Sequence, residues 1–303
     1  MRFITNLKGA RLKKHNFAII GGDKRISYVA QILSGKGYSV ICYGVMDVQS
    51  SSNLSIANSL KEAISNSMVI IFGIPFVKDG SLFFSDGFRV NPSFHHKISL
   101  QDVQRYLRKN QTLFAGMIPH DFRQTCEARQ ITCYDFMTDE SFVMQNAALT
   151  AEGALLEALS HQDTALHQSN ALIIGYGRCG MILADKCKGL HAKVSVCDSL
   201  PQNLARAAAL GFSVLKPVEL CDMIVNFEYL FNTAPSKVFT KTLLQNMHQK
   251  SLLIDIASDR VGVDYEAALD LGRNVLYCPG LPGKYTPQTS ARYISDHILS
   301  MIS

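Results

Sequence analysis

Three glycines in the second half of the chain have the spacing of a phosphate-binding turn. They follow the apolar run ALIIG and open a stretch that is typical of a helix. Glycine at these positions permits a tight turn, close approach of the backbone to a pyrophosphate, and close packing of helix on strand. The free N–H groups at the start of the helix favour an anion. The pattern predicts a dinucleotide site; a tight turn with no ligand is the alternative. The predicted site residues in this turn are Gly175, Tyr176, Gly177, Arg178, Cys179 and Gly180.

Asp198 follows the next apolar run, KVSVC, near the spacing expected for an acid that binds a ribose. A carboxylate there accepts hydrogen bonds from the ribose 2′-OH and repels a 2′-phosphate. Ser199 comes next, no arginine adjoins it, and Arg206 falls in the following predicted helix. The sequence therefore predicts NAD or NADP as cofactor, with Asp198 favouring NAD. The alternative role for Asp198 is to cap the helix that begins near Pro201.

Two further stretches supply residues that can line the nicotinamide ribose. Both groups come just after an apolar run, where the backbone and small side chains of a parallel sheet face a bound cofactor. A plain turn is the alternative for the first group. The predicted residues are Asn232, Thr233 and Pro235 in one stretch, and Ala257 and Ser258 in the other.

The elements that must position these residues follow a repeated pattern. Short apolar runs alternate with amphipathic stretches, and the runs are too continuously apolar to be half-exposed, which is typical of parallel strands covered on both faces. We therefore expect an α/β fold with two doubly wound, Rossmann-like domains. The runs are FAIIGG, SVICYG, MVIIFG, TLFAGM and ITCYDF in the first half, and ALIIG, KVSVC, MIVNF, LLIDIA and NVLYC in the second.

A long helical pattern over residues 141–161 connects the two halves. We expect an N-terminal domain over residues 1–145, a hinge helix over 146–165, and a dinucleotide-binding domain over 166–303. The last helix of the chain is expected to pack back toward the first domain. A cleft between the domains is the predicted ligand site, because the carboxyl ends of both sets of strands face it.

The composition excludes several classes of protein. A chain of 303 residues with 47% hydrophobic and 18% charged residues is expected to form about two soluble globular domains. The net charge of +5 suits an anionic ligand but is too diffuse for nucleic acid. The eight cysteines include no Cys-x-x-Cys pair, so we expect no metal site and free thiols in a reducing cytosol. No apolar run is long enough to span a membrane, and the basic N-terminal arm, without an apolar signal region, is expected to be a solvated segment.

An ordered set of motifs resembles the dipicolinate synthase A-subunit family. The motifs are IIGGDKR (19–25), LTAEGALLEAL (149–159), IIGYGRCGM (173–181), NLARAAALGF (203–212), NTAPSKV (232–238), LLIDIAS (252–258) and CPGLPGKYTPQT (278–289). The resemblance implies oxidation of a dihydrodipicolinate-type precursor to pyridine-2,6-dicarboxylate with a nicotinamide cofactor, usually described as NADP. It also implies a partner, the flavoprotein-like B-subunit, in the mother-cell cytoplasm during spore formation, and we expect a homo-oligomer. Family members tend to have an arginine near the position of Ser199, which this chain lacks.

The proline-rich segment after the last apolar run has no histidine, although 2-hydroxyacid dehydrogenases of similar layout carry one there. Oxidation that forms an aromatic ring can tolerate this, because the product's remaining proton is acidic. Such a site needs placement of the ring and contacts for two carboxylates. Prolines and glycines can form a rigid wall for a flat dianion; the alternative is a connection from strand to helix, with Thr286 as N-cap and Pro287 at the first helical position.

The remaining candidates are assigned by position. Arg260 and Lys284 are predicted to bind substrate carboxylates and to take part in catalysis, with His120 as proton acceptor; a solvated loop histidine is the alternative. Arg25, in a two-glycine turn, is predicted as an anion contact, although a turn without a ligand is the favoured alternative. Glu152 is predicted as either a substrate contact or a solvated helix residue. The full set predicted to bind substrate is Arg25, Glu152, Arg260, Gly280, Leu281, Pro282, Gly283 and Lys284.

Two other functions remain open from the sequence. One is a 2-hydroxyacid dehydrogenase that has moved its acid–base group elsewhere. The other is a nucleotide-binding scaffold that serves a flavoprotein partner without transferring hydride itself. The lack of an obvious catalytic base in the sequence motivates both alternatives.

Overall fold

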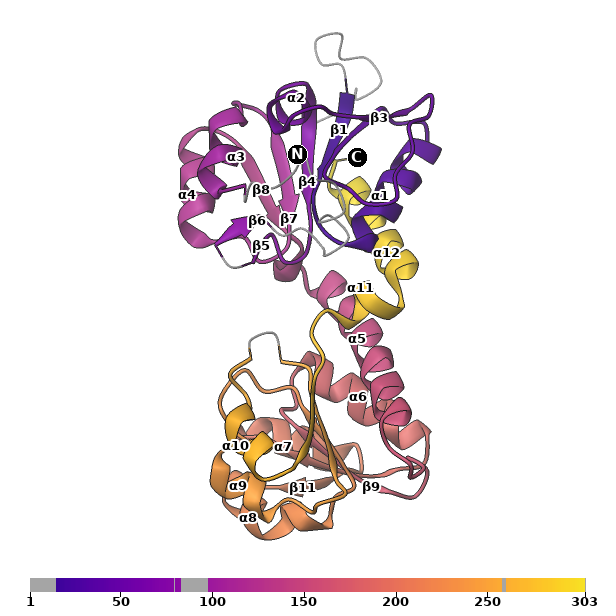
Figure 1. Ribbon diagram of the computed structural model, residues 1–303, viewed down its shortest axis with the longest axis vertical. Coiled ribbons are helices and arrows are strands. Elements are labelled where there is room, and N and C mark those ends of the chain that lie inside the picture. The colour runs from indigo at the N-terminus through magenta and orange to yellow at the C-terminus, as the bar shows by residue number, and fades with distance from the viewer. Residues whose placement is uncertain (1–14, 79, 83–97, 258–259, 303) are drawn as a thin grey trace. The chain divides into compact units, whose positions relative to one another are not determined.

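The structure is a computed structural model that describes residues 15–78, 80–82, 98–257 and 260–302 (Figure 1). The basic arm over residues 1–14 and the predicted site residue Ser258 therefore lie outside the described residues. The chain divides into two compact units. Unit 1 comprises residues 1–143 and 286–303, and unit 2 comprises residues 144–285. The structure thus assigns the predicted hinge helix to unit 2 and the last helix to unit 1.

Unit 1 is built on a parallel sheet with strand order β3-β2-β1-β4-β7-β8. The strands are β1 (His15–Ile20), β2 (Val40–Tyr43), β3 (Leu54–Ile56), β4 (Ser67–Phe72), β7 (Thr112–Ala115) and β8 (Thr132–Asp135), with a small hairpin of β5 (Val77–Lys78) and β6 (Ser81–Leu82). The helices are α1 (Lys24–Gly35), α2 (Leu60–Ser65), α3 (Leu100–Tyr106), α4 (His120–Ala128), the 3-10 turn η3 (Phe136–Thr138) and α12 (Pro287–Ile302).

Each face of this sheet has its own apolar core. Helices α1 and α12 cover one face, with Ala291, Ile294 and Ile298 of α12 fully buried against that core. Helices α2, α3 and α4 cover the other face. Helix α12 begins at Pro287, whose fixed φ suits the first helical position and whose missing N–H needs no partner there.

Unit 2 repeats the same topology, with strand order β11-β10-β9-β12-β13-β14. The strands are β9 (Asn170–Ile174), β10 (Lys193–Cys197), β11 (Ser213–Leu215), β12 (Tyr229–Asn232), β13 (Leu252–Asp255) and β14 (Asn274–Tyr277). The helices are α5 (Glu140–Ser160), which starts in unit 1, α6 (Arg178–Gly189), α7 (Pro201–Ala209), α8 (Leu220–Met223), α9 (Lys241–Asn246), α10 (Tyr265–Asp270) and α11 (Leu281–Tyr285), with 3-10 turns η4 (Pro217–Glu219) and η5 (Ile224–Asn226).

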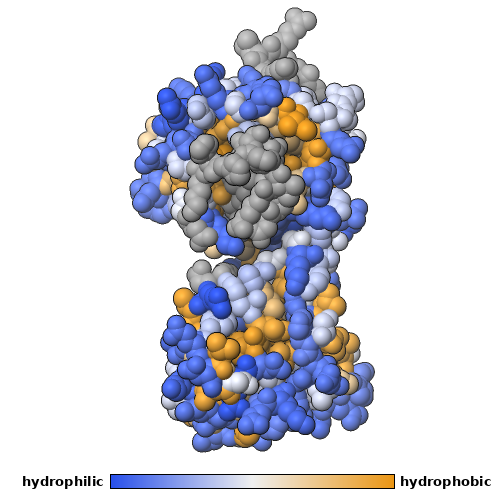
Figure 2. Space-filling model, viewed as in Figure 1, coloured by the Kyte–Doolittle hydropathy of each residue, from blue (hydrophilic) through white to orange (hydrophobic). Residues whose placement is uncertain are grey.

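The predicted fold class is confirmed: both sheets are parallel and doubly wound. Hydrophilic and hydrophobic residues are interspersed on the face of unit 2 that Figure 2 shows, while the central strands β1, β4, β9, β12 and β13 are almost wholly buried. None of the helices in the described ranges is long and apolar enough to cross a bilayer.

Two predictions about individual elements are wrong. The run MIVNF, residues 223–227, was predicted to be a strand but is helical, and the strand is β12, four residues long, at Tyr229–Asn232. Val225 of that run is 48% exposed, whereas every residue of β12 is buried. The proline-rich segment is also not wholly a loop, because Leu281–Tyr285 forms α11. Proline is tolerated there because the N–H groups of a helix's first turn have no partner in the helix.

Candidate functional site

The residues at the carboxyl edge of the unit 2 sheet change from apolar to polar near the centre of the sheet. In the strand register, Cys197, Ile174, Asn232, Asp255 and Tyr277 are neighbours in one row across β10, β9, β12, β13 and β14. The chain winds in opposite directions from β9 and β12, so a crevice between their ends is expected to hold a ligand. The polar members of the row begin at β12, beside this switch point.

Packing within the chain requires glycine at two positions of the turn after β9. Gly175 has φ of +87°, and a Cβ there would lie 2.7 Å from Thr233 Oγ1. A Cβ at Gly180 would lie 1.9 Å from the carbonyl oxygen of Gly175, so only glycine lets α6 approach the turn. The Thr233 hydroxyl donates to the carbonyl oxygens of Ile174 and Gly175, at 3.1 and 3.0 Å, and so ties the turn to the end of β12.

Gly177 has a different environment. It is the N-cap residue of α6, its φ of −79° is ordinary, and a Cβ there would meet no described atom within 4 Å. Packing therefore does not require glycine at this position. The open space lies in front of the first N–H groups of α6, which suits a phosphate group. A pyrophosphate fits the residues present.

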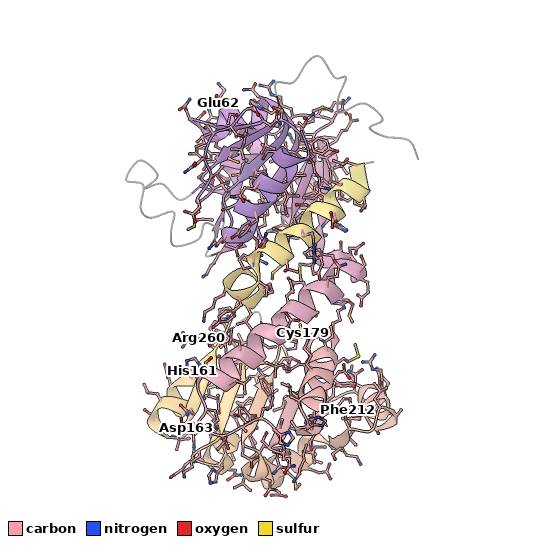
Figure 3. All side chains as sticks on the ribbon, turned by 90° about the vertical axis from the view of Figure 1, so that its right-hand side faces the viewer. Glu62, His161, Asp163, Cys179, Phe212 and Arg260 are labelled. Carbon is pink, nitrogen blue, oxygen red and sulfur yellow. The ribbon has the colours of Figure 1, made fainter. Side chains whose placement is uncertain are left out.

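The other residues of the turn lie at the same place. Arg178 is exposed at the first position of α6. Cys179 is half-buried, and burial raises the pKa of its thiol despite the nearby Arg178 charge, so the thiol stays protonated. Figure 3 shows Cys179 and Arg260 at the same end of unit 2, while Asp163 and Phe212, which precede strands, lie nearer the other end.

Asp198 is already engaged in the structure. Its carboxylate accepts hydrogen bonds from Tyr176 N at 2.6 Å, Leu200 N at 2.8 Å and Asn203 Nδ2 at 3.1 Å. The carboxylate thus joins the glycine turn to the start of α7, which is close to the capping role, while remaining half-buried at the ribose position. Arg206, which the sequence placed away from the site, reaches back from α7 and donates to the Tyr176 carbonyl at 3.0 Å.

Beyond the switch point, Asp255 is the centre of a buried polar network. Its side chain is fully buried at the end of β13 and accepts from Asn232 Nδ2 at 2.9 Å, Ala257 N at 3.1 Å and Tyr265 Oη at 2.5 Å. A Cβ at Gly262 would lie 2.3 Å from Asn232 Nδ2, so glycine permits this arrangement. Asn232 and Ala257 are therefore held by the network.

Arg260 lies above the same network. Its guanidinium carbon is 4.4 Å from the centre of the Tyr265 ring and 5.7 Å from that of Tyr277. Arg260 itself is exposed, and no ion pair joins it to any described carboxylate. Pro235, the last of the residues predicted beside the nicotinamide, is exposed after β12, and Ser199 is exposed after β10.

The segment predicted as a wall for the substrate packs against α5. Gly280 adopts φ of +67° and starts the turn into α11, where Leu281 and Pro282 are buried. A Cβ at Gly153 of α5 would lie 2.7 Å from Leu281 Cβ, so this glycine lets the two helices approach. Gly283 is half-buried in α11, where its N–H donates to the Gly280 carbonyl oxygen at 3.0 Å.

Lys284 also faces α5. Its ammonium is 2.5 Å from Glu157 Oε1, and the Tyr285 hydroxyl donates to the same oxygen at 2.7 Å. The Glu157 side chain is only 5% exposed, whereas that of Lys284 is 56% exposed. Burial would raise the pKa of Glu157, but the hydrogen bonds from Lys284 and Tyr285, together with the positive charge of Lys284, lower it overall. The hydrogen bond with Glu157 raises the pKa of Lys284.

Two other candidates lie on the surface. Glu152 is 3.1 Å from Lys186 of α6, and half of its side chain is exposed. His120 starts α4 in unit 1; 78% of its side chain is exposed, and it lies 3.7 Å from Asp121. Nothing in the structure tests either predicted role, and both stay predictions.

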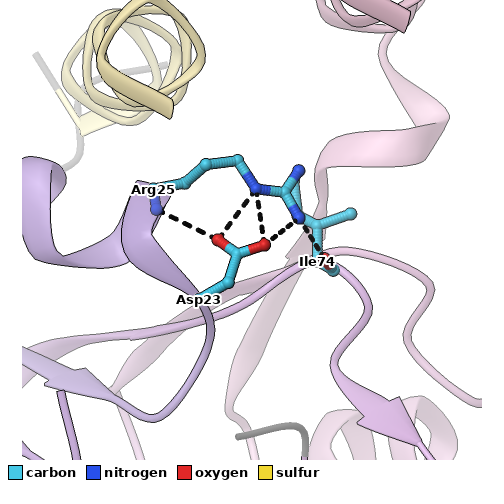
Figure 4. Close-up of polar contacts among 3 residues, drawn as sticks. All are labelled: Asp23, Arg25 and Ile74. Atoms are coloured by element: carbon cyan, nitrogen blue, oxygen red, sulfur yellow. Dashed lines mark hydrogen bonds and ion pairs between the residues drawn. The ribbon is translucent and has the colours of Figure 1, made fainter. Parts of the chain in front are cut away.

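Arg25 is held at the carboxyl edge of the unit 1 sheet (Figure 4). Its guanidinium donates to both oxygens of Asp23 at 2.7–3.0 Å, and to the Ile74 carbonyl at 2.5 Å, just after β4. Its side chain is 5% exposed. The anion contact predicted for Arg25 therefore faces competition from Asp23, which already neutralises its charge.

The sequence interpretation missed Glu157, Tyr265 and Tyr277, and it placed Asp255 only by its position after an apolar run. The sequence carried a signal for Glu157 and for the burial of Asp255. Glu157 is four residues after Gly153 in an otherwise apolar part of a long helix, which places both on one face. Asp255 ends an apolar run, where a buried carboxylate needs partners. The tyrosines carry no comparable local pattern.

Comparisons with known proteins agree with this architecture. The family model described as the N-terminal domain of the dipicolinate synthase A-subunit matches residues 16–137. The dipicolinate synthase A-subunit of Bacillus subtilis (strain 168) is 30% identical over 164 residues, which cover 54% of this chain and 55% of that protein. The chain is therefore similar to dipicolinate synthase A-subunits. The matched segment spans about half the length of the Bacillus subtilis relative.

Solved structures of two dipicolinate synthase A-subunits share the fold. The A-subunit from Bacillus halodurans matches with a TM-score of 0.83 at 23% identity, over 96% of this chain and 99% of that one. The A-subunit from Bacillus subtilis matches with a TM-score of 0.80 at 23% identity, over 96% and 97% of the two chains. The family model described as D-isomer specific 2-hydroxyacid dehydrogenase, NAD binding domain, matches residues 142–270. Unit 2 is therefore similar to the NAD-binding domains of such dehydrogenases.

Proposed function

We propose that the chain is an NAD(P)-dependent oxidoreductase that converts dihydrodipicolinate to dipicolinate, as the A-subunit of dipicolinate synthase. One observation carries the cofactor part of the proposal: Gly177 leaves open space before the N-terminus of α6, at the switch point of a dehydrogenase-type sheet. The similarity to dipicolinate synthase A-subunits supports the substrate part. A nicotinamide cofactor, when bound, accepts the hydride that the dihydropyridine ring loses.

The chain's own residues would bind and orient the two ligands. The first N–H groups of α6, with Arg178, would hold the pyrophosphate, and Asp198 would accept from the adenosine ribose, which favours NAD over NADP. Asn232 and Thr233 would lie beside the nicotinamide ribose, since they end β12 at the switch point. Pro235, Ser199, Ala257 and Ser258 stay predictions for the same site.

Arg260 is the first choice for a carboxylate contact in unit 2. Its guanidinium is exposed and makes no ion pair with a described residue, so an incoming carboxylate displaces no acidic partner among them. Lys284 must first leave Glu157, which would then remain buried and without that charge partner. The segment that carries Lys284 would be fixed in place by its other predicted residues, Gly280, Leu281, Pro282 and Gly283.

The proton released on aromatisation is acidic and needs only water or a weak base. His120 stays the proposed acceptor, because its exposed ring at the start of α4 is open to ligands. We further propose that the chain works with the flavoprotein-like B-subunit in the mother-cell cytoplasm, and that it forms a homo-oligomer.

Turnover is tested by following dipicolinate absorbance with the chain alone, with the B-subunit, and with NAD or NADP in turn. A matched pair of variants tests the site. A Cβ meets no described atom within 4 Å at either Gly177 or Gly189, the first lying before α6 and the second at its far end. We expect Gly177→Ala to weaken dinucleotide binding at least about tenfold, since displaced phosphate contacts are charge-assisted and each contributes about 1.5–3 kcal/mol. Gly189→Ala should leave it unchanged; equal affinity for both variants would refute the site.

A second candidate function is supported by the 2-hydroxyacid dehydrogenase family model that matches unit 2. Rapid reduction of a 2-oxo acid by the purified chain with NADH would favour it. If no dipicolinate forms without a flavin, whatever the concentration of nicotinamide cofactor, the chain would instead be a nucleotide-binding scaffold. Each result contradicts the proposal for a separate reason.

A further inference from the structure

Arg260 is held by aromatic faces, and no acid in the described part of the chain pairs with it. The Tyr265 and Tyr277 rings lie 6.1 Å apart at 74°, and the guanidinium carbon is 4.4 and 5.7 Å from their centres. Contact with a ring face leaves the in-plane N–H groups of a guanidinium available. A salt bridge would have used those same N–H groups. This arrangement fixes a cation while keeping its donors open to a ligand.

Asp255 lies behind Tyr265, on the far side from solvent. It is fully buried and accepts the Tyr265 hydroxyl at 2.5 Å, while Asn232 Nδ2 and Ala257 N occupy its other oxygen, Oδ1. A phenol that donates to a carboxylate carries more electron density on its ring, which strengthens the attraction between the ring and a cation. The buried negative charge therefore acts on Arg260 through the ring, without neutralising it by direct contact.

The titration of Tyr265 agrees with this geometry. Burial raises the pKa of the Tyr265 hydroxyl, the hydrogen bond and negative charge of Asp255 raise it further, and only Arg260 opposes them. The hydroxyl therefore stays protonated, and its proton stays on the bond to Asp255, throughout the physiological pH range. The pair is suited to hold a neighbouring group and not to exchange protons with a substrate.

We propose that Asp255 and Tyr265 are positioning residues that hold the Arg260 guanidinium at the carboxyl edge of β13 and β14, as a fixed binding group for a carboxylate of the substrate. This inference rests on the proposed function, because the anion is one carboxylate of the dicarboxylate substrate. The three strands that end at Asn232, Asp255 and Tyr277 are adjacent and in register, so the holding residues belong to the sheet itself.

The test measures binding of pyridine-2,6-dicarboxylate and of NAD separately, by calorimetry on the full chain. Arg260→Ala should weaken diacid binding about tenfold or more, since a charge-assisted contact contributes about 1.5–3 kcal/mol. Tyr265→Leu removes the ring and should weaken it about two- to thirtyfold, the range that cation–π energies predict. Tyr265→Phe keeps the ring but loses the bond to Asp255, and should fall between Tyr265→Leu and the unmutated chain. NAD affinity should stay within about twofold for all three, because no phosphate contact changes.

Tyr229→Phe is the matched control, because the Tyr229 hydroxyl also donates from a buried ring, to the Thr164 carbonyl, at the opposite edge of the sheet. It should lower stability without changing diacid affinity. If it weakens diacid binding as much as Tyr265→Phe, the effect is general loosening and the positioning role is refuted. In turnover assays, Tyr265→Phe should raise KM with kcat little changed.

The outcomes separate this inference from the proposed function. If Arg260→Ala weakens diacid binding but both Tyr265 variants bind as the unmutated chain does, the positioning role is refuted and the Arg260 contact stands. If Arg260→Ala has no effect on a chain that still binds NAD and forms dipicolinate, the carboxylate contact is elsewhere and this inference fails while the function holds.

Discussion

The contact between α5 and α11 provides the sharpest prediction about stability. Glu157 is buried on α5 and accepts from Lys284 at 2.5 Å and from Tyr285 at 2.7 Å. We expect Glu157→Gln to destabilise unit 2, because the amide has the same shape but no charge. The glutamine oxygen can keep one neutral hydrogen bond, from the Tyr285 hydroxyl.

The magnitude follows from the exposure of each partner. A hydrogen bond to a charged group contributes about 1.5–3 kcal/mol, and a neutral one about 0.5–1.5 kcal/mol. The ion pair with Lys284 must be discounted to about 0–1 kcal/mol, since the lysine side chain is 56% exposed. The net loss at neutral pH is therefore about 1–3 kcal/mol, which corresponds to about 2–4 °C in melting temperature per kcal/mol.

The stabilising effect of Glu157 should depend on pH. Folding lowers the pKa of Glu157, so its carboxylate stabilises the fold fully above its unfolded value of about 4.3. That contribution is lost as the pH falls through the lowered folded value. Thermal unfolding followed by circular dichroism should therefore show a gap between the unmutated chain and Glu157→Gln at pH 7 that closes in acid.

Glu152→Gln is the control for this experiment. Glu152 lies on the same helix and pairs with Lys186 at 3.1 Å, but half of its side chain is exposed. Glu152→Gln should lower the free energy of unfolding by no more than about 1 kcal/mol. If Glu157→Gln melts with the unmutated chain at pH 7, or if the two variants behave alike at every pH, the argument that Glu157 is a buried and charge-stabilised partner of α11 is refuted.

The remaining predictions concern two other close contacts. Gly153→Ala would place a Cβ 2.7 Å from Leu281 Cβ. Overpacking of about 1–3 kcal/mol should outweigh the gain of about 1 kcal/mol in helix propensity, so chemical denaturation should show a lower free energy of unfolding. A higher free energy of unfolding would show that α11 can shift away from α5 without cost. Asp198→Ala should narrow the preference for NAD over NADP in binding measurements, because it removes the repulsion of a 2′-phosphate. Tighter binding of NADP than of NAD by the unmutated chain would show that Asp198 does not contact the ribose.

The fold was largely predictable because both sheets are parallel and covered on both faces. Their central strands are continuous apolar runs between helices, and that pattern is visible in any single sequence. Two of the strands that were missed, β3 and β11, have three residues each and lie at sheet edges, where Val214 is 39% exposed. MIVNF was mistaken for a strand because a short apolar run has no periodicity that separates a buried helix turn from a strand.

The candidate site was predictable only where backbone geometry dictates the residue. Gly175 and Gly180 are dictated by a positive φ and by a 1.9 Å approach, and such demands leave a glycine in the sequence. Asp255 and Tyr265 are ten residues apart, and their bond depends on how the segment between β13 and α10 returns to the sheet. No local pattern encodes that return, so the sequence could not show that a buried acid lies behind the ring that holds Arg260.

The proline-rich segment shows that a motif shared with a family can owe its residues to packing within the chain. Its resemblance to the family was read together with the Thr-Ala-Glu-Gly segment of α5, and in the structure these two motifs contact each other through Gly153 with Leu281 and through Glu157 with Lys284. Two segments that must fit one another constrain each other's residues whether or not they touch a ligand. The missing histidine is then explained by geometry as well as by chemistry, because Leu281, Lys284 and Tyr285 of this segment already contact α5. A group that contacts substrate in unit 2 is better sought where a cation has no acidic partner among the described residues, and Arg260 meets that condition.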